Sequence, residues 1–134
     1  MSGPRKTAIV TGASQGIGAG IVKAFVERGF NVVGKDRDVK AGRTATFTAA
    51  LNALALAKKQ LGSLDRVSRR VRLGVYVAAT PDFIDHAKVA DAASELLRDV
   101  LGEETISSRV VIGVASLPLG SPVELEVILE VKTV

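Results

Sequence analysis

Three glycines near the amino terminus form the sharpest chemical motif of the chain. Gly12, Gly16 and Gly18 follow a short apolar run over residues 7–10. In a strand–loop–helix unit, the first glycine permits a tight turn, the second lets the backbone approach a pyrophosphate, and the third lets the helix pack closely on the strand. The motif therefore indicates either a dinucleotide-binding loop or a βαβ unit that packs in the same way without a nucleotide.

A second polar group lies near the carboxyl terminus. Residues 109–116 and 123–131 read as two strands joined by a turn that is rich in proline and glycine, so we expect a β-hairpin. On the expected register, Arg109 and Glu124 share one face while the other face is apolar. A guanidinium binds a carboxylate bidentately, which makes this face a shallow polar site or a subunit contact. The alternative is a solvated face on which Arg109 pairs with Glu130.

The hydrophobic pattern predicts the elements that position these groups. They are a strand at 7–10, a helix over 17–26, a strand from 31, a helix over 44–61, a strand over 67–77, a helix over 80–101, and the hairpin. This order, βαβ-α-β-α-ββ, predicts an α/β fold with a single mixed sheet and three helices. Phe47, Leu51, Leu54 and Leu61 are expected on one face of the second helix. The strand at 67–77 is expected to turn Arg70 and Arg72 away from its buried face.

Composition limits the remaining possibilities. A chain of 134 residues has room for one domain, 1–134, and it holds no cysteine and one histidine, so no metal site is expected. The longest apolar stretches fall far short of the roughly 20 residues that span a bilayer, and no signal-peptide pattern is present; we expect no membrane partner and a cytoplasmic protein. Residues 1–73 are basic and come nearest to a cluster at Arg66, Arg69, Arg70 and Arg72, but Tyr76 is the only aromatic residue near this cluster, so no nucleic-acid partner is expected.

The segment Lys6–Gly18, with its Gly-x-x-x-Gly-x-Gly spacing, resembles the opening of the short-chain dehydrogenases/reductases. The resemblance covers about residues 5–33. It implies a vestigial NAD(P) site made by Gly12, Gly16 and Gly18, with Asp36 where an acid favours NAD. The family's catalytic Tyr-x-x-x-Lys is missing, because the single tyrosine, Tyr76, is not followed by a lysine at that spacing. Hydride transfer is therefore not expected.

Several later motifs resemble the RidA (YjgF) family. They include Leu61–Val67, Ala79–Phe83, Ser108-Arg109 and Val114–Gly120, and the resemblance covers about residues 34–131. It implies a chorismate-mutase-like fold for this part, a homotrimer, and hydrolysis of enamine or imine intermediates to a keto acid and ammonia. The chain thus reads as a chimera within one domain, with segments 5–33 and 34–131.

The RidA resemblance also implies roles for single residues. Arg109 matches the arginine that binds the substrate carboxylate, and Glu124 matches the acid that positions the hydrolytic water. Asp91 stands where the family usually has an asparagine. The N-terminal strands that complete the family's pocket are replaced here, so we expect reduced activity.

Three hypotheses follow for function. The first is a RidA-like imine deaminase, trimeric, acting on a small imine or carboxylate without a cofactor. The second is a catalytically inactive scaffold. The third is an NAD(P)-binding module without dehydrogenase activity.

Overall fold

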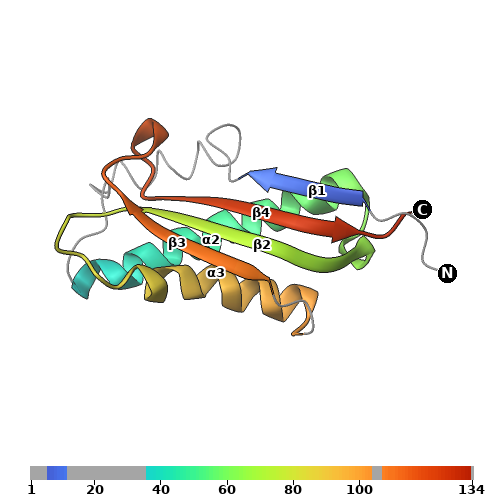
Figure 1. Cartoon of the computed structure of the whole chain (residues 1–134), viewed down its shortest axis with the longest axis horizontal. Coiled ribbons are helices and arrows are strands. Elements are labelled where there is room, and N and C mark those ends of the chain that lie inside the picture. The colour runs from blue at the N-terminus through green and yellow to red at the C-terminus, as the bar shows by residue number, and fades with distance from the viewer. Residues whose placement is uncertain (1–5, 12–35, 104–106, 134) are drawn as a thin grey trace.

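The computed structural model describes residues 6–11, 36–103 and 107–133. The elements in these ranges are β1 (Lys6–Thr11), α2 (Asp36–Leu61), the 3-10 turn η1 (Leu64–Arg66), β2 (Val67–Ala78), α3 (His86–Leu101), β3 (Ser108–Val114), the 3-10 turn η2 (Pro118–Gly120) and β4 (Val123–Val131). Figure 1 shows the four strands side by side in one sheet. Both described helices pack against this sheet and against each other.

The strands form a mixed sheet in the order β1-β4-β2-β3. β4 is antiparallel to both β1 and β2, whereas β2 and β3 are parallel and joined through α3. This confirms the predicted α/β class with a single mixed sheet. Two of the three expected helices are α2 and α3; the helix predicted over 17–26 and the strand predicted from 31 lie outside the described residues.

The predicted hairpin between the last two strands is wrong. β3 and β4 are not neighbours, because β2 lies between them. The end of β2 is bonded on both sides: the Ala78 amide donates to the Pro122 carbonyl at 2.9 Å, and the Ala79 amide donates to the Val114 carbonyl at 3.0 Å. A strand, a helix and a second strand normally form a right-handed crossover that sets the two strands parallel and side by side. β3 therefore lies on one side of β2, and β4 pairs with the other side of β2.

Both helices end where predicted but begin elsewhere. Gly62 and Gly102 stop α2 and α3 in positive-φ conformations, and each donates its amide to the carbonyl four residues earlier. α2 begins at Asp36, eight residues before its predicted start, because the polar segment around Gly42 is helical. α3 begins at His86 and not near residue 80, because the Phe83 amide closes a turn onto the Thr80 carbonyl at 3.0 Å.

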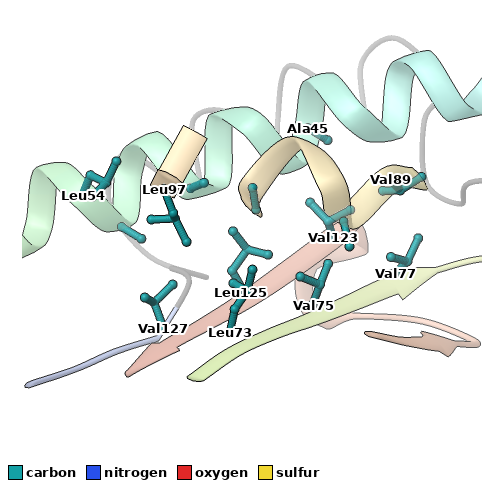
Figure 2. Packing of buried hydrophobic residues seen from close by; sticks show 14 of the residues in the cluster. Ala45, Leu54, Leu73, Val75, Val77, Val89, Leu97, Val123, Leu125 and Val127 are labelled. Atoms are coloured by element: carbon teal, nitrogen blue, oxygen red, sulfur yellow. The ribbon is translucent and has the colours of Figure 1, made fainter. Parts of the chain in front are cut away.

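The core lies between the helices and one face of the sheet (Figure 2). Its largest fully buried side chains are Leu73, Val75 and Val77 of β2, Val89 and Leu97 of α3, and Leu125, Val127 and Leu129 of β4. The buried stripe of α2 consists mainly of small residues, Ala45, Thr46, Ala50, Ala53 and Ala57, with Leu54. The predicted large apolar face of α2 is therefore wrong in part, since Phe47 and Leu51 are 46% and 48% exposed. Small side chains let α2 approach the sheet and α3 closely.

Candidate functional site

Arg109 is anchored from one side by α3. Its Nη1 donates to Asp91 Oδ1 at 2.7 Å and to Ser94 Oγ at 3.1 Å. Both contacts use the same nitrogen, and in the described part of the chain Nε and Nη2 make no hydrogen bond. Nε and Nη2 form the parallel edge of the guanidinium that binds a carboxylate with two hydrogen bonds. The fold thus holds Arg109 in place through one nitrogen and leaves the Nε and Nη2 edge without a hydrogen bond to the described residues.

Arg109 borders an open hollow of about 400 Å³ between α3 and the starts of β2 and β3. α3 contributes residues spaced three, four and seven apart, which share one side of a helix. The lining residues are Arg70, Asp91, Ser94, Glu95, Arg98, Ser107 and Arg109. Three of them are arginines and two are acids. We call this group of residues the arginine hollow.

Arg70 is the most buried charged group of the arginine hollow, with 7% of its surface exposed. Burial lowers the pKa of Arg70 below its ordinary value, and the positive charge of Arg98 lowers it further. Arg70 and Arg98 are therefore close enough for their charges to repel each other.

The position of Arg70 corrects the sequence prediction, which placed it away from the buried face of its strand. The pairing of β2 with β4 shifts between Arg70 and Arg72, where two residues of β2 advance by only one residue of β4. This β-bulge turns Arg70 to the core side, opposite the buried Leu129. No sequence signal marks such a bulge.

The acids of the arginine hollow already have partners. Asp91 accepts from Arg109, and Glu95 accepts from Arg43 of α2 at 2.7 Å. Asp99 lies outside the hollow and pairs with Arg98 at 3.5 Å, a long contact between side chains that are 48% and 69% exposed. Exposed pairs of this kind contribute little stability, so Arg98 can move to another partner at small cost.

Glu124 does not join Arg109, contrary to the prediction that they share a face. Arg109 lies opposite Leu73 of β2, and Glu124 lies opposite Tyr76 of the same strand. Leu73 and Tyr76 are three positions apart, and side chains alternate along a strand, so Arg109 and Glu124 belong to opposite faces of the sheet. Glu130, the alternative partner of Arg109, instead contacts Ser68 and Arg69.

The opposite face of the sheet collects the half-buried Glu124 and Glu126, with Ile112 at 44% exposure. Glu126 pairs with Arg72 at 3.2 Å. Both described helices lie on the other side of the sheet, where the core is (Figure 2), so neither of them covers this face.

The predicted cofactor residues remain a prediction. Gly12, Gly16 and Gly18 lie outside the described residues, and Asp36 is the first residue of α2. The described residues hold no group of three or more histidine or acidic side chains that could bind a metal ion. Among the same residues, neither helix combines the length and the apolar character that crossing a bilayer requires.

Sequence analysis named Arg109, Glu124 and Asp91 as candidate site residues, and it did not name Arg70, Ser94 or Arg98 as candidates. The three missed residues line the arginine hollow with Arg109. The spacing of Asp91, Ser94 and Arg98 along a single helix was the available signal, since it places them on one side of that helix.

Comparison with known proteins agrees with this fold. A family model described as "YjgF/chorismate mutase-like, putative endoribonuclease" matches residues 23–131. The chain therefore belongs to the YjgF family and is a RidA-like protein, with the chorismate-mutase-like fold. The match begins earlier than the residue 34 expected from the sequence.

Individual relatives support the assignment. Protein TCP17 of Trypanosoma cruzi is 38% identical over 101 residues, which cover 75% of this chain and 63% of TCP17. The chain thus spans less than two thirds of that relative. The crystal structure of Atu1372 of Agrobacterium tumefaciens, a protein of unknown function, has a TM-score of 0.69 at 36% identity and covers 71% of this chain and 62% of that one. A structure from Shewanella oneidensis MR-1, described as a putative endoribonuclease, has a TM-score of 0.74 at 26% identity. The match covers 98% of this chain and 82% of that one.

The dehydrogenase-like segment matches curated dehydrogenases over a short stretch. L-fucose dehydrogenases of cattle and rabbit are 60% and 55% identical over 38 residues, which are 28% of this chain and 14% and 13% of those enzymes. These matches are a weak indication of a short-chain dehydrogenase-like fragment. In the structure, β1 of that segment pairs antiparallel with β4 and extends the sheet of the YjgF-like part.

Proposed function

We propose that this chain hydrolyses small 2-imino acids or their enamine tautomers, with Arg109 binding the substrate carboxylate. The observation that carries the proposal is the open Nε and Nη2 edge of Arg109 beside the arginine hollow, while Asp91 and Ser94 fix its Nη1. A fixed guanidinium loses little conformational freedom when a carboxylate binds, and this strengthens binding.

The reaction needs one water and no cofactor. The water oxygen attacks the imine carbon, a new C–O bond forms, and the C–N bond breaks. The water protons pass to nitrogen, which leaves as ammonia, and the carbon keeps a carbonyl oxygen. The products are a 2-oxo acid and ammonia, so no electrons are gained or lost overall.

We propose further that Glu124 acts as the base that positions this water, and that it does so across a subunit boundary. Arg109 and Glu124 lie on opposite faces of the sheet, so one chain does not direct both toward one substrate. In a homotrimer built on the sheet face that neither described helix covers, Glu124 of one copy would lie toward the arginine hollow of the next copy. The exposed Ile112 on that face gives such a contact an apolar residue to bury.

The first test measures ammonia release from imines generated in situ by an amino-acid oxidase. The chain should accelerate release, and Arg109→Ala and Glu124→Gln should each lower the acceleration by about 100-fold or more, the usual range for a positioned base or anchor. Circular dichroism and gel filtration verify that both variants fold and assemble. No acceleration by the folded wild-type chain would favour the inactive scaffold and overturn the proposal.

Mixing the two inactive variants tests the shared site. In randomly mixed trimers, about a quarter of the sites combine an intact Arg109 with an intact Glu124 from the neighbouring copy, because each residue is intact in half of the chains. Coexpressed Arg109→Ala and Glu124→Gln chains should therefore regain about a quarter of the wild-type rate. A mixture that stays inactive would show that the two residues do not act across the boundary.

The third hypothesis, nucleotide binding by Gly12, Gly16, Gly18 and Asp36, is tested separately by the thermal shift of the chain with NAD or NADP. Because a site limited to one βαβ unit lacks most of the contacts that hold a dinucleotide, we propose that neither nucleotide raises the Tm. A rise that saturates with concentration would contradict this.

A further inference from the structure

A second hollow, of about 570 Å³, lies at the carboxyl ends of the parallel strands β2 and β3, beside the start of α3. Sites for small molecules usually have volumes of about 300–1,000 Å³, and in α/β folds they lie outside the carboxyl ends of parallel strands. The lining residues are Ala79, Thr80, Pro81, Phe83, His86, Gly113, Val114 and Ala115. None of them lines the arginine hollow. We call this group of residues the histidine hollow.

The imidazole of His86, the single histidine of the chain, is held in place by two neighbours. The ring of Phe83 packs edge to face against it, with the ring centroids 5.0 Å apart and the planes at 78°. The imidazole also lies directly against Gly113, where a Cβ would overlap it. Glycine weakens the interior of a strand and often marks a place where another group approaches closely. The absence of a side chain at Gly113 therefore makes room for the imidazole.

The hydrogen-bonding capacity of His86 is not used by the described residues. Among them, neither ring nitrogen of His86 has a hydrogen bond or an ion pair. A neutral imidazole has one nitrogen that donates and one that accepts. The side chain is half-buried, so packing orders the ring before a ligand arrives. A ligand that hydrogen-bonds to this ring therefore gains the bond at a small cost in conformational entropy.

The rest of the lining limits the chemical class of the ligand. Thr80 contributes a hydroxyl, whereas no lysine, arginine, aspartate or glutamate of the described residues lines the hollow. A charged ligand would lose its water here without gaining an opposite charge. Aromatic rings attract one another edge to face or offset, as His86 and Phe83 already do, so a third ring fits beside them. The lining therefore favours a neutral aromatic molecule with one polar group.

We propose that the histidine hollow binds small phenols. The phenol hydroxyl donates to the accepting nitrogen of His86, and the phenol ring packs against Pro81 and Phe83. This site is separate from the arginine hollow and does not rest on the proposed imine hydrolysis.

Two ligands test the hydrogen bond: 4-fluorophenol and 4-fluoroanisole differ in the methyl group that replaces the hydroxyl proton. Titrations followed by fluorine NMR should show that the wild-type protein binds 4-fluorophenol about fivefold more tightly, as one net hydrogen bond would give. The imidazole resonances of His86 should shift with the same saturation curve. These resonances have no overlap from other histidines, because the chain has none.

Two variants locate the site. His86→Phe keeps an aromatic ring beside Gly113 but removes the accepting nitrogen, so the two ligands should bind equally. Ala115→Phe fills the hollow from its exposed rim and should abolish saturable binding of both ligands. Ser116→Phe is the matched control, because it adds the same ring at the next residue, which is exposed and does not line the hollow. It should leave both affinities unchanged.

Four outcomes would overturn the proposal. They are no saturable binding to the folded wild-type protein, equal affinity for the two ligands, a preference for 4-fluorophenol that persists in His86→Phe, and binding that survives in Ala115→Phe or is lost in Ser116→Phe. Circular dichroism verifies that each variant is folded. None of these outcomes bears on Arg109, so the proposed function is tested separately by ammonia release.

Discussion

Replacing Asp91 by asparagine should strengthen the binding of a 2-oxo acid to the arginine hollow. Asp91 accepts from Arg109 Nη1 at 2.7 Å, on the side of the guanidinium away from the proposed ligand edge. An asparagine oxygen can accept the same hydrogen bond, so Arg109 should keep its orientation. The substitution removes the negative charge of Asp91, which would repel a carboxylate bound on the other side of the guanidinium.

The size of the effect follows from this geometry. A carboxylate on the Nε and Nη2 edge lies about 7 Å from Asp91, which gives a repulsion of about 0.6 kcal/mol at the dielectric constant of water and about 2.4 kcal/mol at an effective value of 20. Salt at about 0.1 M screens roughly half of this at that distance. A gain of about 0.3 to 1.2 kcal/mol corresponds to about a two- to eightfold lower Kd.

The Asp91→Asn substitution should lower the free energy of unfolding only slightly. The side chains of Arg109 and Asp91 are 32% and 44% exposed, and exposed ion pairs contribute about 0.2–1 kcal/mol. Urea denaturation should therefore show a loss within that range, too small to confuse the binding measurement.

The assay is titration calorimetry with 2-oxopentanoate at low salt and again near 1 M salt. The advantage of Asp91→Asn should shrink at high salt, because the screening length falls to about 3 Å. Glu95→Gln is the matched control: it removes an acid from the same hollow, but one that Arg43 already neutralises at 2.7 Å. Its effect on Kd should stay below about twofold.

An Asp91→Asn variant that binds the ligand more weakly, or equally well at low salt, would refute this reasoning. Asp91 would then contact the ligand itself, for instance as an acceptor for the substrate nitrogen. A gain that persists at high salt would refute the electrostatic cause.

Three further predictions concern stability and are measured by urea denaturation. Gly113→Ala should cost about 1 kcal/mol, because its Cβ would overlap the imidazole of His86, and the cost should disappear in a His86→Ala background; an unchanged cost there would contradict the overlap. Leu125→Ala should cost about 2–5 kcal/mol, since this side chain is 1% exposed in the core; a smaller loss would mean that the helices close over the cavity. Arg43→Gln should cost about 0.2–1 kcal/mol, because its pair with Glu95 is exposed, and a loss of 2 kcal/mol or more would contradict this.

The sequence was sufficient to predict most elements, because each has a strong local pattern. The strand over 67–77 and the helix ends at Gly62 and Gly102 needed only periodicity and a glycine stop. Helix starts were harder to predict. The segment around Gly42 has the composition of a turn but is helical, since packing in the tertiary structure overrides a weak local preference.

Strand pairing could not be predicted from local pattern. The two last strands are separated by a short turn, and such spacing is typical of a hairpin. Their alternation is equally compatible with β2 lying between them, and a pattern of period two does not specify a partner. The bulge at Arg70 is similarly hidden, because it depends on the register with β4 and not on the residues of β2 alone.

The corrected pairing changes what Arg109 and Glu124 can do. In a hairpin they would share a face and form a site within one chain. In the parallel β2–α3–β3 unit, Arg109 instead lies beneath α3, whose Asp91 and Ser94 hold it, and Glu124 lies on the side of the sheet that neither described helix covers. The described part of a single chain therefore does not bring the proposed carboxylate anchor and the proposed base together. Either a second copy supplies Glu124, in which case activity depends on assembly, or Glu124 is structural and the hollow binds carboxylates without hydrolysing imines. The complementation experiment separates these cases, because only the first restores activity from two inactive chains.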